Sequence, residues 1–176
     1  MIKELNIPNS LGFCKKCFRS RRDGSAYCEK CSNSDELERI KIYISDNKFP
    51  LLHKVLIKFN IKNEYDLENV VFTYGDTIYA ASNVIREMPF HLVAHELTHV
   101  FQQLKMGKDK WWDKYLKSNK FRLEQETEAY RQQYKVAKNK SDITGAYVLE
   151  KVAKDLSGDL YGNIISFEKA KKLILE

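Results

Sequence analysis

The chain has 176 residues, of which 43% are hydrophobic and 31% are charged, and its net charge is +6. This composition excludes a disordered or fibrous protein, and the length fits one compact domain with a small additional module. No apolar run reaches the roughly 20 residues that span a bilayer, and the N-terminus has no apolar segment typical of a signal peptide. We therefore expect a cytoplasmic protein with no membrane association. The mild positive charge permits a nucleic-acid partner without requiring one.

Residues 1–34 are predicted to form a separate module, because they contain all four cysteines and little apolar material for a core. The cysteines form two CxxC pairs with ten residues between them: Cys14, Cys17, Cys28 and Cys31. Four thiolates close a tetrahedral shell, so the pattern predicts a zinc ribbon with one structural zinc ion, whose binding supplies the folding energy that so short a segment lacks. Two disulfides, free thiols and a rubredoxin-like iron site are the alternatives.

Residues 35–176 are predicted to form the main domain, which begins with strands. Isoleucine alternates with other residues over 40–45, which favours a half-buried strand, although one helical face is also compatible. A helix is expected over residues 50–59, opened by a proline. Residues 70–73 and 77–80 have high strand propensity and flank a glycine-containing turn at 74–76. This pattern predicts a β-hairpin.

The rest of the chain is predicted to be mostly helical. Helices are expected over about 88–106, 122–138, 143–156 and 167–175, and the first of them should end at Gly107. Residues 108–120 are predicted as a linking stretch with two tryptophans among lysines. Such a stretch suits either single-stranded nucleic acid or a cap over the core. The expected fold class is therefore α+β, a small sheet followed mainly by helices.

The first of these helices contains an HExxH sequence, His95-Glu96-Leu97-Thr98-His99. Two histidines four residues apart share a helical face and can bind one tetrahedral zinc ion, and Glu96 can reach a water bound to that zinc. Apolar neighbours such as Val93 and Val100 predict that the helix is buried. A buried glutamate without a partner is costly, and a metal site removes that cost. We therefore prefer a catalytic zinc site to histidines that merely hydrogen-bond within a core.

A catalytic zinc site needs a third protein ligand, and no histidine or cysteine follows His99. Carboxylates on the next long helix are the main candidates. Glu124 and Glu128 share one face of that helix, and Glu126 lies roughly opposite. His91, one turn before the motif, is a further candidate. The spacing alone leaves the third ligand open.

The segment HELTHVFQQ, followed on the next helix by ETEAY, resembles the gluzincin branch of the zincin metallopeptidases over about residues 65–135. The resemblance implies a zincin-like fold in which the catalytic zinc is bound by the two motif histidines and Glu126, with Glu128 as second choice. Tyr130 stands where such enzymes usually have an aspartate that hydrogen-bonds a ligand histidine, so that supporting role is open, and Tyr130 is also a candidate oxyanion stabiliser. The resemblance further implies that the strand 77–81 borders the cleft.

The leading hypothesis is a zinc-dependent metallopeptidase that hydrolyses peptide bonds of a protein or peptide substrate through a zinc-activated water, with Glu96 as the general base. One alternative is a protease similar to the SprT group, which associates with nucleic acid but uses a third histidine that this chain lacks. Another is a non-catalytic binding protein that combines the ribbon with a zincin scaffold. Arg19, Arg21 and Arg22 in the ribbon suit nucleic acid or a docked protein, and we favour the protein.

These patterns predict two zinc ions per chain, one in the four-cysteine module and one at the HExxH motif. Elemental analysis of the full chain should find two equivalents, and replacing His95 and His99 by alanine should remove one of them. A single equivalent that survives this double substitution would contradict the catalytic site. Iron in place of one zinc would contradict only the assignment of the cysteine module.

Overall fold

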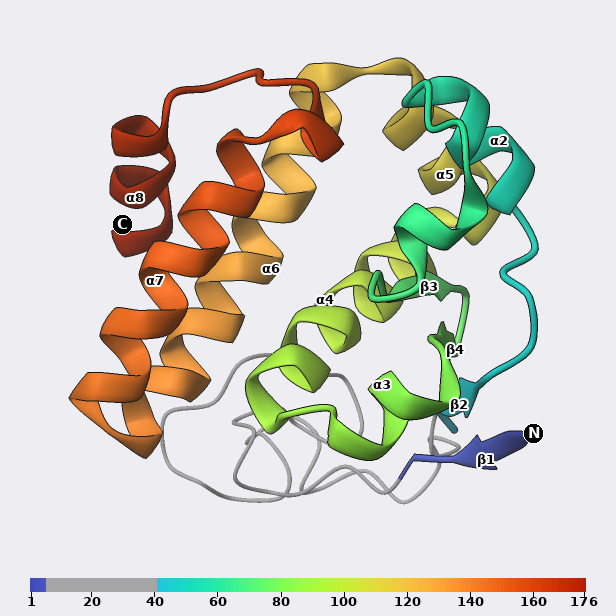
Figure 1. The fold of residues 1–176 in the computed structure, drawn as a ribbon, viewed down its shortest axis with the longest axis horizontal. Coiled ribbons are helices and arrows are strands. Elements are labelled where there is room, and N and C mark those ends of the chain that lie inside the picture. The colour runs from blue at the N-terminus through green and yellow to red at the C-terminus, as the bar shows by residue number, and fades with distance from the viewer. Residues whose placement is uncertain (6–40) are drawn as a thin grey trace.

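The computed structural model describes residues 1–5 and 41–176 (Figure 1). The four cysteines and three arginines of the predicted zinc ribbon lie outside the described residues. Among those that are described, no helix is long and apolar enough to cross a membrane. Over residues 1–5 and 41–176 the fold is α+β as expected, with one small sheet and a larger helical part.

Four short strands form one mixed sheet in the order β1-β2-β4-β3. They are β1 (Ile2–Glu4), β2 (Tyr43–Ser45), β3 (Phe72–Tyr74) and β4 (Thr77–Tyr79). Strand β2 pairs with β1 antiparallel and with β4 parallel, while β3 and β4 form the predicted hairpin. Its turn contains Gly75 at φ 65°, a conformation that glycine adopts without steric cost. Strand β1 belongs to the range predicted as the ribbon module, so this range also contributes an edge strand to the main domain.

The long helices form the body of the domain. They are α4 (Phe90–Met106), α6 (Asn119–Lys140), α7 (Asp142–Ser157) and α8 (Phe167–Leu175), in good agreement with the four predicted ranges. Helix α4 packs on both β3 and α6, and α6, α7 and α8 pack on one another (Figure 1). Ser118, Ser141 and Ser166 begin the last three helices, and each accepts a hydrogen bond from a backbone N–H in the first turn.

The prediction of a linking stretch at 108–120 is wrong, because most of it forms helix α5 (Lys108–Lys117). Gly107, at φ 87°, ends α4 and directly precedes α5, so the glycine marks a corner between two helices. Trp111, Trp112 and Tyr115 lie on the buried side of α5. The interpretation that the tryptophans cap the core is therefore confirmed, and they are not exposed for stacking on bases.

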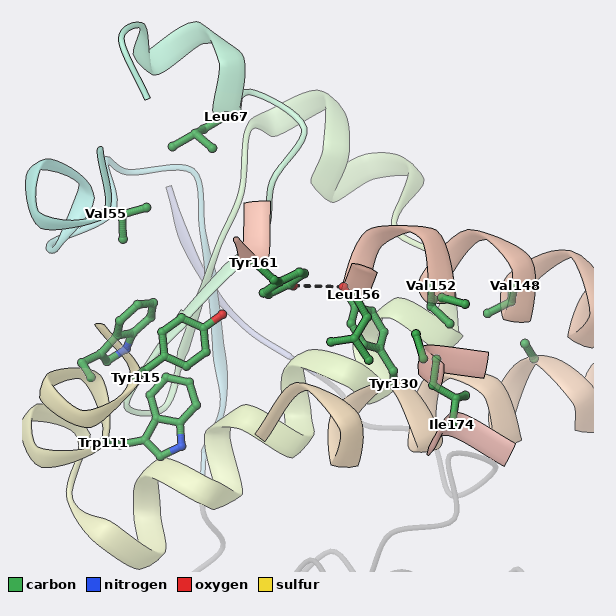
Figure 2. Close-up of a cluster of buried hydrophobic side chains, with 14 of the residues drawn as sticks. Val55, Leu67, Trp111, Tyr115, Tyr130, Val148, Val152, Leu156, Tyr161 and Ile174 are labelled. Atoms are coloured by element: carbon green, nitrogen blue, oxygen red, sulfur yellow. Dashed lines mark hydrogen bonds between the residues drawn. The ribbon is translucent and has the colours of Figure 1, made fainter. Parts of the chain in front are cut away.

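Shorter elements complete the fold. The predicted helix at 50–59 is present as α2 (Leu52–Lys58), whereas α3 (Ser82–Glu87) and two 3-10 turns, η2 (Glu64–Leu67) and η3 (Asp159–Tyr161), were not predicted. Figure 2 shows how these pieces meet in one hydrophobic cluster. Val55 and Leu67 lie on one side, Trp111 and Tyr115 on another, and Tyr161 lies between them and the α6–α7 interface.

Helices α6 and α7 approach closely at Gly145, and this gives a stability prediction. A Cβ added at Gly145 would lie 2.9 Å from the Cα of Lys138, closer than such atoms can pack. Glycine-to-alanine changes in helices usually stabilise by about 0.4–1 kcal/mol. At Gly145 the clash should turn this stabilisation into a destabilisation. Gly145→Ala is therefore expected to lower the free energy of unfolding by about 1–3 kcal/mol.

Urea denaturation of the full chain measures this change. Tyr147→Ala is the matched control, since Tyr147 is exposed on the same helix and its loss should change stability by no more than about 0.5 kcal/mol. A Gly145→Ala protein that is more stable than wild type would contradict the close helix contact.

Candidate metal centre

Helices α4 and α6 bring three potential metal ligands together. His95 and His99 lie one turn apart on α4, and Glu126 faces them from α6. The two Nε2 atoms are 3.0 Å apart, His95 Nε2 is 3.4 Å from Glu126 Oε2, and His99 Nε2 is 3.5 Å from Glu126 Oε1. All three side chains are buried, and Glu126 is only 2% exposed.

These distances fit a zinc ion. Zinc–nitrogen and zinc–oxygen bonds of about 2.0–2.2 Å in a tetrahedron place the ligand atoms roughly 3.3–3.5 Å apart. The two separations between a histidine nitrogen and a Glu126 oxygen, 3.4 and 3.5 Å, lie in this range, and the two nitrogens are slightly closer together at 3.0 Å. Three protein ligands leave one position open, as catalytic zinc sites require. Of the carboxylates considered on α6, Glu126 points into the site, whereas Glu124 and Glu128 are exposed.

The charge of Glu126 favours a cation at this position. Burial by itself raises the pKa of the Glu126 carboxyl, but His99 and His95 outweigh this effect and hold the pKa well below its usual range. Burial likewise lowers the pKa of His99, but the Glu126 carboxylate dominates and raises it to about 9. The carboxylate is therefore ionised and needs a positive partner, which either a proton on the imidazole pair or a metal ion can provide.

Glu96 lies beside the ligands and has its own support from the sheet. It is 3% exposed, and Thr73 Oγ1 donates a hydrogen bond of 2.7 Å to Glu96 Oε2. Glu96 and the three ligands line a cavity of about 50 Å³, which has room for water. The arrangement can thus hold a water between a metal ion and a carboxylate base.

Two tyrosines missed by the sequence analysis complete the surroundings of Glu126. Tyr115 of α5 donates to Glu126 Oε1 at 2.6 Å, and Tyr161 of η3 donates to Glu126 Oε2 at 3.1 Å. Burial and then the Glu126 charge raise the pKa of both hydroxyls well above the usual tyrosine value. Both are therefore neutral donors. Tyr161 lies 35 residues from Glu126 in the chain, so no local pattern could have indicated it.

Tyr130 and His91, two of the supporting candidates, do not contact the ligand atoms through hydrogen bonds. The ring centroid of Tyr130 lies 4.5 Å from that of His95, and the Tyr130 hydroxyl is 3.0 Å from that of Tyr161. The hydrogen bond between the two tyrosines can be followed in Figure 2. Within the described part of the chain, Nδ1 of His95 has no hydrogen-bond partner. His91 is half-buried and pairs with the Gln133 amide, outside the group that could bind a metal.

The strand that lies beside the site is β3. The resemblance implied that the strand 77–81 borders the cleft, and this prediction is wrong. Strand β4 lies inside the sheet between β2 and β3, whereas β3 forms the edge and carries Thr73. The Thr73 carbonyl already accepts hydrogen bonds from Gln103 Nε2 at 2.9 Å and from Trp112 Nε1 at 3.0 Å. This part of the edge is therefore occupied by side-chain donors.

Comparisons of the chain with protein-family models, with curated proteins and with solved structures find no match. The resemblance to gluzincins consequently rests on the motif residues, and the fold family and activity that it implies are proposals.

The geometry predicts that Glu126→Ala weakens zinc binding at the histidine site. Removing a group that hydrogen-bonds a ligand lowers metal affinity by roughly 10- to 100-fold. Glu126→Ala removes a ligand itself, so its zinc affinity should fall by more than that. Competition with a chromophoric chelator, performed on the full chain, measures the affinity. Glu124→Ala is the control, since Glu124 is exposed on the same helix. Unchanged zinc affinity in Glu126→Ala would contradict the assignment.

Proposed function

We propose that the chain is a zinc-dependent metallopeptidase with His95, His99 and Glu126 as the ligands of its catalytic zinc. The observation that carries the proposal is the convergence of these three buried side chains beside Glu96, a further carboxylate held from the sheet. A bound zinc ion supplies Lewis acidity and lowers the pKa of its water to about 7.

Glu96 is the general base in this proposal. Thr73 occupies one oxygen of its carboxylate and fixes the orientation of the group, which leaves the other oxygen to take a proton from the attacking water. The same oxygen then delivers this proton to the leaving amine, so Glu96 returns to its starting state. Tyr115 and Tyr161 hold the ligand carboxylate in position, and both line the cavity where the reacting carbonyl must lie.

The walls of the cavity bear on substrate entry. Val55 and Phe59, at α2, lie on one side, and Trp111 and Trp112 of α5 lie on another. Ligand pockets usually enclose about 300–1,000 Å³, so a cavity of about 50 Å³ holds water but no peptide segment. Helix α5 is fixed by tryptophan hydrogen bonds to Thr73 and Gln125. A polypeptide substrate therefore needs a wider opening between these walls.

The other hypotheses have less support. An exposed aromatic platform would favour the binding of nucleic acid, but the two tryptophans are buried. A non-catalytic scaffold has no need of Glu96 placed beside the ligands. We also propose that the protein acts in the cytoplasm and carries a second, structural zinc in the cysteine module, because thiolate ligands need a reducing compartment.

The proposed role of Glu96 predicts that Glu96→Gln retains zinc and loses hydrolysis. The amide oxygen can still accept from Thr73, but it cannot take a proton from water, so the rate should fall by at least about 10²- to 10⁴-fold. Incubation with a mixture of denatured proteins, followed by mass spectrometry of the fragments, measures cleavage.

Elemental analysis of the same variant provides the control. Wild-type cleavage should disappear with a chelator and return with zinc. A Glu96→Gln protein that keeps its zinc and cleaves as fast as wild type would show that Glu96 is not the base.

A further inference from the structure

Gln102 hydrogen-bonds to both helices that carry the proposed ligands. Its Oε1 lies 2.9 Å from Nδ1 of His99, three residues earlier on α4. Its Nε2 donates to the backbone carbonyl of Gln125 at 3.1 Å and to Glu128 Oε2 at 2.9 Å, both on α6. The side chain is only 7% exposed, so these contacts rather than water satisfy its amide.

The partners fix which way the Gln102 amide points. A backbone carbonyl and a carboxylate only accept hydrogen bonds, so the amide nitrogen has to face Gln125 and Glu128. The amide oxygen then faces His99, and Nδ1 of His99 has to carry a proton to donate to it. In the neutral imidazole this leaves the lone pair on Nε2, the atom that lies 3.0 Å from His95 Nε2 and 3.5 Å from Glu126.

The same amide also holds the backbone next to the third ligand. Gln125 immediately precedes Glu126, and its own side chain accepts a hydrogen bond of 2.9 Å from Trp111 Nε1 of α5. Gln102 thereby links the ring of one ligand to the main chain beside another. His95 differs, because its Nδ1 has no partner in the described residues. His99 is therefore the histidine whose tautomer and ring orientation the fold sets.

We propose that Gln102 is a positioning residue of the metal centre, and that the Glu128 carboxylate acts through it by holding the amide in the orientation that presents Nε2 of His99 to the metal. This inference rests on the proposed metal site and not on the proposed peptidase activity. It gives Glu128, the second-choice ligand from the sequence, a role two hydrogen bonds removed from His99.

Zinc affinity and the His99 tautomer, both measured on the full chain, test the inference with zinc alone as the probe. Chelator competition reports the affinity of the zinc equivalent that disappears in His99→Ala. Two-bond ¹H–¹⁵N correlation spectra of the zinc-free protein, recorded at a pH above the raised pKa of His99, report which ring nitrogen of the neutral imidazole is protonated. The variants are Gln102→Ala, Glu128→Ala and Glu128→Gln, with Glu124→Ala as the control on the exposed side of α6.

Gln102→Ala should weaken zinc binding by about 10- to 100-fold, the usual cost of removing a group that supports a ligand, and should lose the pure Nδ1–H tautomer of His99. Glu128→Ala should weaken binding by less, about three- to tenfold, because Gln125 still holds the amide. Glu128→Gln should bind as wild type, since its amide oxygen can accept the same hydrogen bond. Glu124→Ala should also bind as wild type.

Wild-type zinc affinity and an unchanged tautomer in Gln102→Ala would overturn the inference while leaving the metal site intact. If Gln102→Ala does not fold, the Glu128 pair decides: equal affinity in Glu128→Ala and Glu128→Gln would overturn the role of Glu128. An Nε2–H tautomer of His99 in the wild-type protein would overturn the whole arrangement. A wild-type chain that binds no zinc at the histidine site would instead refute the proposed function itself.

Discussion

The buried charge of Glu126 is the constraint around which the domain is organised. A carboxylate that is 2% exposed has lost nearly all contact with water, and an ionised group in that position is costly unless positive charge and hydrogen-bond donors replace the water. The structure supplies both. Two imidazoles approach from α4, and tyrosine hydroxyls come from α5 and η3. Three elements, α4, α5 and η3, therefore converge on one side chain of α6.

Helix α5 and strand β3 are fixed around this site by side-chain hydrogen bonds. Trp111 and Trp112 bury their rings over the site and use their indole N–H groups to fix α5 to Gln125 and Thr73. Thr73 in turn connects the sheet edge to Glu96, so the base is held from β3 while the ligands are held between α4 and α6. A metal bound by the three ligands would add to the stability of the same packing, because binding energy at a preformed site is folding energy.

Local patterns predicted what depends on local geometry. Helix boundaries followed from prolines and glycines, and the placing of His95 and His99 on one face followed from their spacing. The choice of Glu126 came from a family resemblance, because three glutamates at alternate positions cannot be ranked without knowing which face of α6 is buried. Helix α5 was missed since its aromatic residues stand among charged ones and Gly107 suggested a break. Tyr161 was missed because only tertiary packing brings it to the site.

The central claim is that His95, His99 and Glu126 bind one zinc ion with a coordination position left for water beside Glu96. An anomalous difference map from crystals of the full chain, recorded at the zinc absorption edge, tests it most directly. The account predicts a peak within about 2.0–2.2 Å of both histidine Nε2 atoms and of a Glu126 oxygen, with a fourth, non-protein ligand facing Glu96. No peak among these residues in a zinc-loaded crystal, or a peak with a fourth protein ligand that closes the site, would contradict it.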